Sequence, residues 1–415
     1  MHLFRLLLFT FSVAASFAGC DLASSPKIEI LDPVEGPSQL LVEGKPMHLR
    51  GAQTDSHLAL LKKAGANALL IPSDRPWRDT ALTSLLNQAA TLELHVVMPV
   101  PVDLEALASQ DQAQVKRAIQ QSAKAVQKLS SHSNIILWVV TPKHLTAIPP
   151  ALPEHLEPLL EAIRSADPHR PVAFDLAPLN VESLTDFVPA LQSFDALGIE
   201  IAGNQAGGKR LRDAGWRKAY FLTAYGMPPW QHHLDEDGLL REPSSQQQAQ
   251  LLADIHAREF TDDSDCIGGF VRGWSEEPKG TLTYGALFLQ RNRTLAAFDV
   301  VQQEWTQNAI INPAPTIGEL RLVDANDRLT AGSSIAAEIG GVPTDQSLRY
   351  HWILTTEPNP ERPQESIEVI SQMRGRSPRQ VFGLPYASGK YRLHVVVEDA
   401  RNRAATASKP LTISG

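Results

Sequence analysis

Short apolar runs alternate with longer helix-period segments between residues 46 and 308. The longer segments repeat apolar positions every three or four residues, as Leu82, Leu85, Leu86 and Ala89 do. The apolar runs lie at 47–53, 68–73, 95–100, 134–140, 171–176, 196–202, 219–224 and 267–274. Eight such runs with helical crossovers in about 260 residues predict parallel strands closed into a (β/α)8 TIM barrel, an α/β fold. A doubly wound open sheet is the alternative, but the Gly-rich loop that usually follows its first strand is absent from the sequence.

The pattern changes to period two in the last quarter of the chain. Polar and apolar residues alternate in "SLRYHWILTT" and "GKYRLHVVVEDA", with turn residues between such segments. About 100 residues of this kind predict a small all-β sandwich. The segment "YRLHVVVEDARNRAA" resembles the closing strands of immunoglobulin-like modules of the polycystic-kidney-disease type. We therefore expect a barrel at 46–308 and an immunoglobulin-like sandwich at 313–415.

The first 20 residues differ from everything that follows. They combine one Arg, an apolar run and small residues before Cys20, which predicts an export signal whose apolar core is too short for a span of about 20 residues. The segment "FAGC" resembles a bacterial lipoprotein cleavage box, and this implies lipidation of Cys20. A cleaved signal with a coincidental Cys is the alternative. Asp21 resembles an inner-membrane retention signal, so we expect a periplasm-facing anchor, followed by a linker at 21–45 with short strands.

Composition narrows the possible partners. The net charge is −8 with both signs well mixed, so the sequence lacks the basic patch of a nucleic-acid-binding protein. Only Cys20 and Cys266 are present, too few for a disulfide framework, and Cys266 is expected to be buried and inert. The acidic, His-containing segment "WQHHLDEDG" at 230–238 matches no defined metal spacing and is interpreted as a solvated loop. We expect neither metal nor cofactor.

Several segments, in order, resemble the barrel of the family 2 glycoside hydrolases. They are "GKPMHLRGAQ", "LLKKAGANALLIP", "LNQAATLELHVVMPV", "SHSNIILWVV" and "RSADPHRPV". The resemblance covers about residues 45–305. It implies a sugar-cleaving barrel whose two catalytic glutamates stand at the C-terminal ends of strands four and seven, and such chemistry needs two carboxylates.

Both glutamates that the resemblance implies are replaced in this sequence. The Asn-Glu pair after the strand-four Trp138 reads Pro142-Lys143, and the strand-seven position reads Ala224 within "FLTAYGM". A one-residue slip of the alignment rescues neither, because no Asp or Glu occurs at 134–153 or at 214–234. Lysine, with an unperturbed pKa near 10.4, is a poor proton donor to a glycosidic oxygen, and alanine is no nucleophile. We expect the usual double displacement to be lost.

Other carboxylates remain at predicted strand ends. Asp175 ends strand five, Glu200 lies in strand six, and Glu276 follows strand eight. A carboxylate within an apolar strand needs a partner if buried, so the main interpretation of Glu200 is an ion pair with Lys143 or Arg272. A relocated acid or base, or a contact with a sugar hydroxyl, is the alternative.

Four aromatic residues are candidates for stacking on a sugar ring near the expected mouth: Trp138, Tyr225, Trp230 and Trp274. Core packing is the competing interpretation, and Trp230 in its Pro-Pro-Trp loop is the strongest ligand-contact candidate.

Three functions are therefore weighed. The first is a membrane-anchored, catalytically degenerate glycosidase-like barrel that binds or guides an envelope or extracellular polysaccharide or oligosaccharide. The second is an active glycoside hydrolase or transglycosylase that uses relocated carboxylates, Glu200 with Glu276. The third is a protein-interaction scaffold of an envelope complex.

Overall fold

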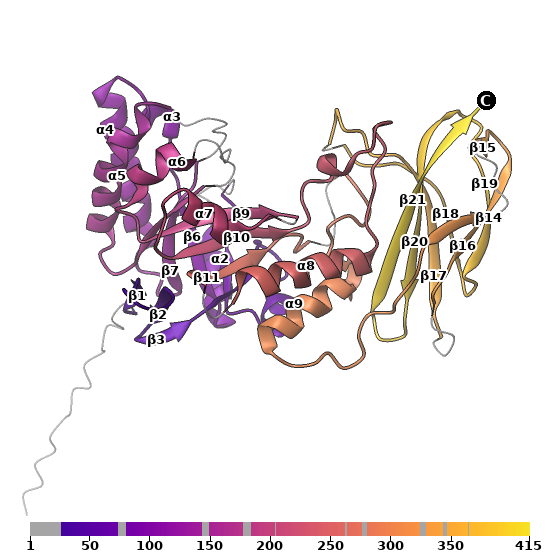
Figure 1. The fold of residues 1–415 in the computed structure, drawn as a ribbon, viewed down its shortest axis with the longest axis horizontal. Coiled ribbons are helices and arrows are strands. Elements are labelled where there is room, and N and C mark those ends of the chain that lie inside the picture. Colours follow the sequence, from indigo (N-terminus) through magenta and orange to yellow (C-terminus); the bar gives the residue numbers. More distant parts are fainter. Residues whose placement is uncertain are drawn as a thin grey trace, which may run out of the picture.

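The computed structural model describes most of the chain. The described residues are 26–73, 80–142, 149–176, 184–203, 205–261, 264–275, 280–323, 329–342, 347–363 and 365–415. In Figure 1 the barrel and the sandwich lie side by side, with helices and loops between them.

Eight parallel strands close into the predicted barrel, in the order β4 to β11 around the ring. They are β4 (Leu49–Gln53), β5 (Ala68–Leu70), β6 (His95–Val100), β7 (Ile135–Val140), β8 (Val172–Asp175), β9 (Ala196–Ala202), β10 (Tyr220–Gly226) and β11 (Cys266–Val271). Every strand falls on one of the eight apolar runs. The prediction of a TIM barrel is confirmed, and its basis is physical, because strands buried on both faces read as continuous apolar runs.

Helices cover the outside of the barrel. They are α1 (Leu58–Lys63), α2 (Thr80–Thr91), α3 (Leu104–Leu107), α4 (Gln112–Leu129), α5 (Leu152–Ala166), α6 (Leu184–Phe187), α7 (Gly207–Asp213), α8 (Ser245–Glu259) and α9 (Ala296–Thr306). Short 3-10 turns occupy Val188–Leu191, Trp230–His233 and Gln290–Asn292. The start of α8 is set by a capping box, in which Ser244 accepts from Gln247 N and the Gln247 side chain accepts from Ser244 N.

A small antiparallel sheet lies against the N-terminal ends of the barrel strands. It consists of β1 (Ile28–Leu31), β2 (Gln39–Val42) and β3 (Lys45–Met47). The carboxylate of Asp32 accepts hydrogen bonds from Ala219 N (2.8 Å) and from Ser38 Oγ (2.6 Å), which ties the sheet to the start of β10. Ile28 and Leu40 join the interior core that contains Phe221 and Phe270. The linker expected to hold short strands therefore closes one end of the barrel.

The C-terminal region is the predicted all-β sandwich. One sheet holds β14 (Leu320–Val323), β16 (Ser334–Ile339) and β19 (Arg379–Gly383). The other holds β15 (Leu329–Thr330), β21 (Ala404–Ser414), β20 (Gly389–Glu398), β17 (Arg349–Thr356) and β18 (Val369–Gly375). Trp352 and Phe382 meet edge to face between the sheets, with ring centroids 5.7 Å apart, and both are buried. A hairpin of β12 (Phe288–Leu289) and β13 (Arg293–Thr294) precedes α9.

Buried ionic groups join the barrel to the sandwich. Arg392 of β20, with 1% of its side chain exposed, pairs with Glu357 and donates to Leu240 O in the loop after β10. Arg403 pairs with Asp299 of α9. Further polar contacts lie at the α8 start, where Thr406 N donates to Ser245 Oγ (3.0 Å). Three ion pairs of the described residues thus cross to the sandwich: Arg392 with Glu242 in the loop after β10 (3.9 Å), Arg403 with Asp299, and Arg293 with Glu398. The Arg392–Glu357 pair itself lies within the sandwich at this interface.

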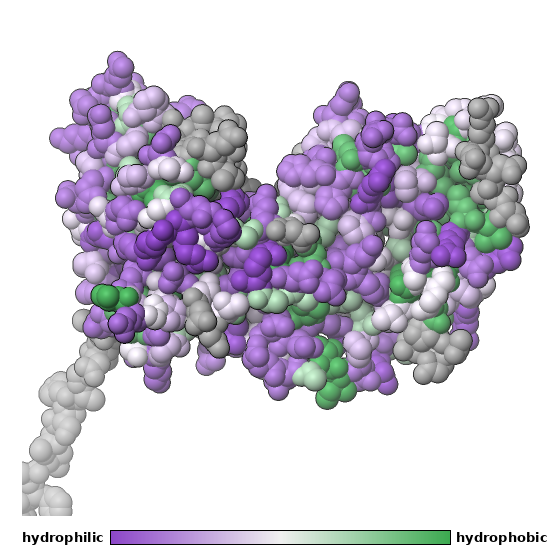
Figure 2. All heavy atoms as spheres, in the orientation of Figure 1, coloured by the Kyte–Doolittle hydropathy of each residue, from purple (hydrophilic) through white to green (hydrophobic). Residues whose placement is uncertain are grey.

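The surface in Figure 2 is mostly polar, and the molecule is hollowed between the outer barrel helices and the loops beside the sandwich. In the part of the chain that the structure describes, no helix is both long enough and apolar enough to cross a bilayer.

Candidate functional site

The C-terminal ends of β9, β10 and β11 bring together the residues that the sequence singled out. Glu200 of β9 forms an ion pair with Arg272, which directly follows β11. The intervening strand β10 presents Ala224, the register partner of Glu200. The ion pair therefore spans β10 at Ala224. Of the two partners expected for Glu200, the structure confirms Arg272.

A register irregularity in β10 sets the direction of the side chains around Ala224. The pairing of β10 with β9 shifts between Leu222 and Ala224, as at a β-bulge. Thr223 faces the barrel interior, where its hydroxyl donates to Asp175 Oδ1 (3.2 Å), while the next residue but one, Tyr225, packs on α8. Ala224, opposite Glu200, lies on the mouth side with only a methyl group to offer.

Asp175 lies one interior layer below Glu200. Its register partner on β9 is Gly198, two residues before Glu200, and its side chain is 6% exposed. A Cβ at Gly198 would come within 2.6 Å of Thr223 Cγ2 and 3.3 Å of Asp175 Oδ1, so only glycine fits there. Asp175 is part of a packed polar contact inside the barrel.

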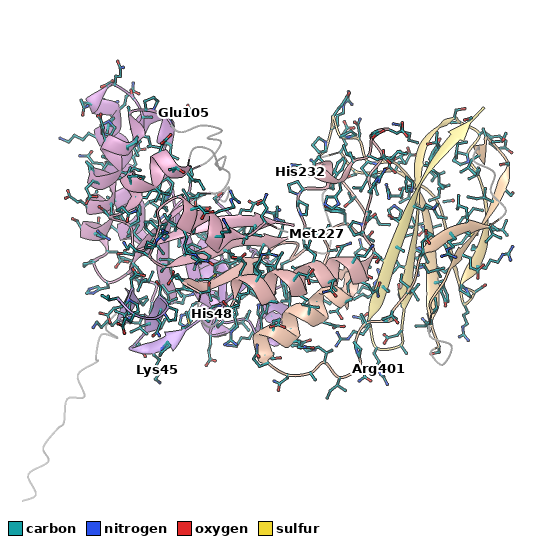
Figure 3. All side chains as sticks on the ribbon, viewed as in Figure 1. Lys45, His48, Glu105, Met227, His232 and Arg401 are labelled. Atoms are coloured by element: carbon teal, nitrogen blue, oxygen red, sulfur yellow. The ribbon has the colours of Figure 1, made fainter. Side chains whose placement is uncertain are left out.

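A small cavity of about 160 Å³ opens beside this ion pair. Its walls include Trp230, Arg272, Tyr284, Met227 and Thr281. Arg272 Nη1 donates to Met227 O (3.1 Å), so the guanidinium is held both by its acid and by the loop after β10. Figure 3 marks Met227 and His232 on the segments that lead from the barrel toward the sandwich. Trp230 is only 6% exposed but lines the cavity, as a ligand-contact residue would.

The other three aromatic candidates lie in the core. Trp138 has no exposed surface and donates from Nε1 to Asp167 Oδ2 (2.9 Å) at the end of α5. Tyr225 is also fully buried. Trp274 is 3% exposed and stacks on Trp305, with centroids 6.0 Å apart. Successive side chains of a strand point to opposite faces, and these rings lie on the face toward the helices or among other buried aromatic rings. Core packing therefore accounts for the positions of Trp138, Tyr225 and Trp274.

Some predicted residues lie outside the described part of the chain. They are Cys20 and Asp21 in the N-terminal segment, Lys143 after β7, and Glu276 after β11.

The acidic segment at 230–238 is an ordered connection toward the sandwich. Asp235 accepts from Leu239 N (2.9 Å) and Asp237 N (3.1 Å), which closes a tight turn. Lys390 of the sandwich donates to Asp237 O. Among the residues with assigned positions, no three His, Cys, Asp or Glu side chains are grouped so as to hold a metal ion. This loop keeps Glu236 and Asp237 exposed while its turn contacts β20 through Lys390.

Sequence reasoning missed the residues that surround Arg272. Tyr284, whose hydroxyl donates to Pro228 O (3.0 Å), comes from a loop far along the chain, and no local motif marks it. Arg272 itself carried a usable signal, because it follows Phe270 by two residues at the end of an apolar run and so continues the interior face of β11.

Comparisons with known proteins show the fold. The sequence matches no protein-family model and no curated protein. Among solved structures, an FMN-binding β-glucuronidase from F. prausnitzii L2-6 is similar, with 13% identity and a TM-score of 0.51, over 94% of this chain and 59% of that one. A β-glucuronidase from Bacteroides uniformis (14%, TM-score 0.48, 93% and 48%) and a galacturonate-bound family 2 β-galacturonidase from Eisenbergiella tayi (16%, 0.48, 68% and 54%) are also similar.

This chain spans about half the length of those proteins. The likeness to the FMN-binding β-glucuronidase is one of fold, and it extends over the TIM barrel and the β-sandwich sheets of this chain. The comparisons thus support a closed (β/α)8 barrel followed by an all-β sandwich.

Proposed function

We propose that this protein is a non-catalytic relative of barrel glycosidases, which binds a saccharide chain at the C-terminal mouth of its barrel. The observation that carries the proposal is the Glu200–Arg272 ion pair spanning Ala224. The family resemblance implies a nucleophilic glutamate at this position. This barrel has Ala224 there, and the Glu200–Arg272 salt bridge passes over its methyl group.

The described mouth offers groups for binding rather than for bond cleavage. Hydrolysis of a glycosidic bond needs one carboxyl group to donate a proton and a second to attack or to activate water. Of the candidate carboxylates named from the sequence whose positions the structure describes, Glu200 is engaged by Arg272, and Asp175 lies in the interior layer below it. Trp230 and Tyr284, in contrast, supply aromatic surface beside a guanidinium, which suits sugar hydroxyl groups and the apolar face of a ring.

We further propose that the barrel is held at a bacterial membrane through a lipid on Cys20, facing the periplasm. The supporting observation is the apolar N-terminal segment that ends in "FAGC". Metabolic labelling with a radioactive fatty acid tests this directly: label should enter the wild-type chain and be absent from the Cys20→Ala variant. Equal labelling of both would remove the anchor from the proposal and leave the saccharide site untouched.

The saccharide proposal is tested on the full-length protein in detergent. Binding to a glycan array, followed by calorimetry with the best oligosaccharide, should show a ligand whose affinity falls at least about tenfold in Arg272→Gln and in Trp230→Phe. Tyr386→Ala is the matched control, because Tyr386 is a 92% exposed aromatic residue on the sandwich and should leave binding unchanged.

Turnover separates this proposal from the active-enzyme alternative. Activated aryl glycosides of several sugars should be left intact by the wild-type protein. Hydrolysis that is lost in Glu200→Gln would overturn the proposal and assign catalysis to relocated carboxylates. No saccharide binding together with no turnover would instead favour a scaffold for envelope proteins.

A further inference from the structure

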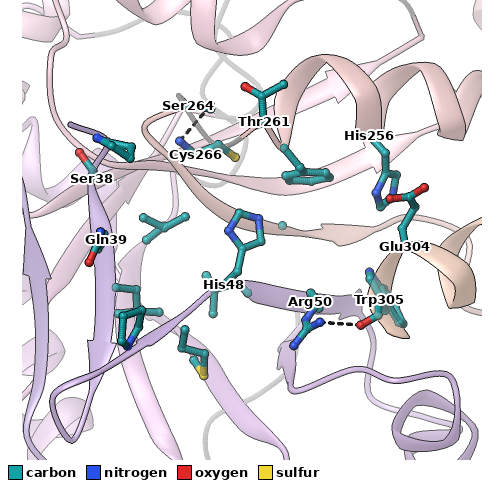
Figure 4. Close-up of a pocket in the computed structure, with 18 of the residues that line it drawn as sticks. Ser38, Gln39, His48, Arg50, His256, Thr261, Ser264, Cys266, Glu304 and Trp305 are labelled. Atoms are coloured by element: carbon teal, nitrogen blue, oxygen red, sulfur yellow. Dashed lines mark hydrogen bonds between the residues drawn. The ribbon is translucent and has the colours of Figure 1, made fainter. Parts of the chain in front are cut away.

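A second, larger cavity lies at the opposite end of the barrel from the mouth. Its volume is about 580 Å³, within the range of roughly 300–1,000 Å³ typical of small-molecule sites. It is enclosed by β2 and β3 of the small sheet, the starts of β4 and β11, and the C-terminal ends of α8 and α9. Figure 4 shows His48 at its centre, with Ser38 and Gln39 on one side and His256, Glu304 and Trp305 on the other.

Arg50 provides a cation in this cavity without a matching anion. Its Nη1 donates to the carbonyl oxygen of Trp305 (2.5 Å), and its Nε is buried without a hydrogen-bond partner. No carboxylate in the described ranges lies within ion-pair distance of Arg50. A buried donor such as this Nε is costly to leave without a hydrogen-bond partner, and the planar donors of a guanidinium suit carboxylate and phosphate oxygens.

The wall around Arg50 is rigid and rich in rings. Phe260 meets His48 edge to face at 5.6 Å and His256 at 4.9 Å. Tyr225 packs against both His256 (5.3 Å) and Phe260 (5.4 Å), so each ring is fixed by its neighbours. His256 is 7% exposed, and its Nε2 has no hydrogen-bond partner in the structure. Three of the polar atoms left without partners, Arg50 Nε, Tyr225 Oη and His256 Nε2, thus belong to residues that line one cavity.

The two imidazoles add hydrogen-bonding groups without adding charge at neutral pH. Burial, and next the nearby His48, lower the pKa of His256 to about 4. The pKa of His48 is likewise lowered to about 4, first by the protein atoms that surround it and then by Arg50, although its ring stays accessible from the cavity. Arg50 is therefore the cation that an anion would meet here, and Glu304 is a carboxylate that also lines the cavity.

We propose that this cavity is a second ligand site, separate from the barrel mouth, for a small hydroxyl-bearing organic oxyanion whose charged group lies on Arg50. The remaining lining matches such a ligand. Ser38, Gln39, Thr261 and Gln307 provide donors and acceptors for hydroxyl groups, and Trp305 offers an aromatic surface. The charged group is a carboxylate or a phosphate, since both have the oxygen geometry that a guanidinium binds.

Calorimetry on the full-length protein in detergent tests the site with two matched pairs of probes. Gluconate is compared with sorbitol, its uncharged counterpart, and glucose 6-phosphate with glucose. At least one of the two anions should bind with an affinity that Arg50→Gln lowers by about tenfold or more. Arg272→Gln, which alters the mouth, is the matched control and should leave that affinity within about twofold.

Arg50 also donates to Trp305 O near the end of α9, so Arg50→Gln could weaken binding by disturbing the structure. A second variant controls for this effect. His48→Leu keeps the backbone and removes a cavity-wall donor, so it should weaken the anion several-fold while near-ultraviolet circular dichroism stays native. Three results would overturn the proposal: neither anion binds, the neutral probes bind equally well in an Arg50-dependent way, or Arg272→Gln and not Arg50→Gln abolishes binding. The last result would place the anion at the mouth and would leave the saccharide proposal standing.

Discussion

Glu200 and Arg272 form an ion pair that reaches over strand β10, with Ala224 beneath it. Neighbouring strands lie about 4.8 Å apart, so a pair between β9 and β11 must cover nearly 10 Å between backbones. Glutamate and arginine together are long enough, provided that the residue between them is small. Ala224 is therefore more than a missing acid, because its methyl group leaves open the path that the salt bridge takes.

Removing this ion pair should change stability little. The side chains of Glu200 and Arg272 are 35% and 27% exposed, and partly exposed pairs typically contribute no more than about 1 kcal/mol. We expect Glu200→Gln to shift the free energy of unfolding in urea by less than about 1 kcal/mol. A loss well above that value would mean that the pair is structurally essential, and binding defects of the mouth variants would then need to be corrected for unfolding.

The ionic contact at the barrel–sandwich interface should behave differently. Arg392 is surrounded by Glu357, by Leu240 O and by Ser408 Oγ (2.8 Å), and both members of the Arg392–Glu357 pair are almost fully buried. Arg392→Met would leave the carboxylates of Glu357 and Glu242 buried without their cation, at a cost of about 3–5 kcal/mol in unfolding free energy.

Arg321→Met is the matched control for that measurement. Arg321 pairs with Glu319 at 3.0 Å, but both side chains are mostly exposed, so its loss should cost less than about 1 kcal/mol. Unfolding curves in guanidinium chloride give both values. Equal effects in Arg392→Met and Arg321→Met would show that the interface does not depend on the buried pair.

Trp138 is expected to matter for stability and not for ligand binding. Its Nε1 donates to Asp167, whose carboxylate also pairs with Arg170. Trp138→Phe removes the indole N–H and so leaves the buried Asp167 carboxylate with one hydrogen bond fewer, which should lower the free energy of unfolding by about 1–3 kcal/mol. Trp274→Phe is the comparison, since Trp274 Nε1 has no hydrogen-bond partner and only ring packing changes. Saccharide affinity that falls in Trp138→Phe, with folding intact, would contradict the core assignment.

The barrel could be predicted because its strands are buried on both faces and therefore stand out as apolar runs. Side-chain direction at the mouth could not be predicted. The irregular register near Thr223 shifts the alternation, so that Tyr225 packs on α8 although Thr223, two residues before it, faces the barrel interior. Nothing in "FLTAYGM" marks this, since a bulge depends on the pairing partner.

The candidate site was predictable in part for a related reason. The sequence suggested two cations, Lys143 and Arg272, as partners of Glu200. The order of the strands in the closed barrel, which places Arg272 two strands from Glu200, shows that Arg272 forms the ion pair. The cavity around Arg50 was not foreseen, because its walls come from four stretches that are far apart in sequence: 37–50, Tyr225, 256–269 and 304–307.

The buried imidazole of His394 predicts a loss of stability in mild acid. Burial, and next the Arg392 cation, lower the pKa of His394 in the folded protein to about 3, below the value near 6.5 of an unfolded chain. The unfolded chain therefore binds the proton first. The contribution of the neutral imidazole is fully present above pH 6.5 and is lost as the pH falls from there toward 3.

At pH 5 the proton taken up by the unfolded chain should cost about 2 kcal/mol of stability for this one residue. Urea unfolding at pH 7.5 and at pH 5 gives the loss of unfolding free energy on acidification. This loss should be smaller for His394→Gln than for the wild type by about 2 kcal/mol. Thr355→Val is the matched control: it removes the hydroxyl 3.1 Å from His394 Nε2, so it should lower stability by a similar amount at both pH values. If His394→Gln keeps the full acid sensitivity of the wild type, other buried groups such as His256 must account for it.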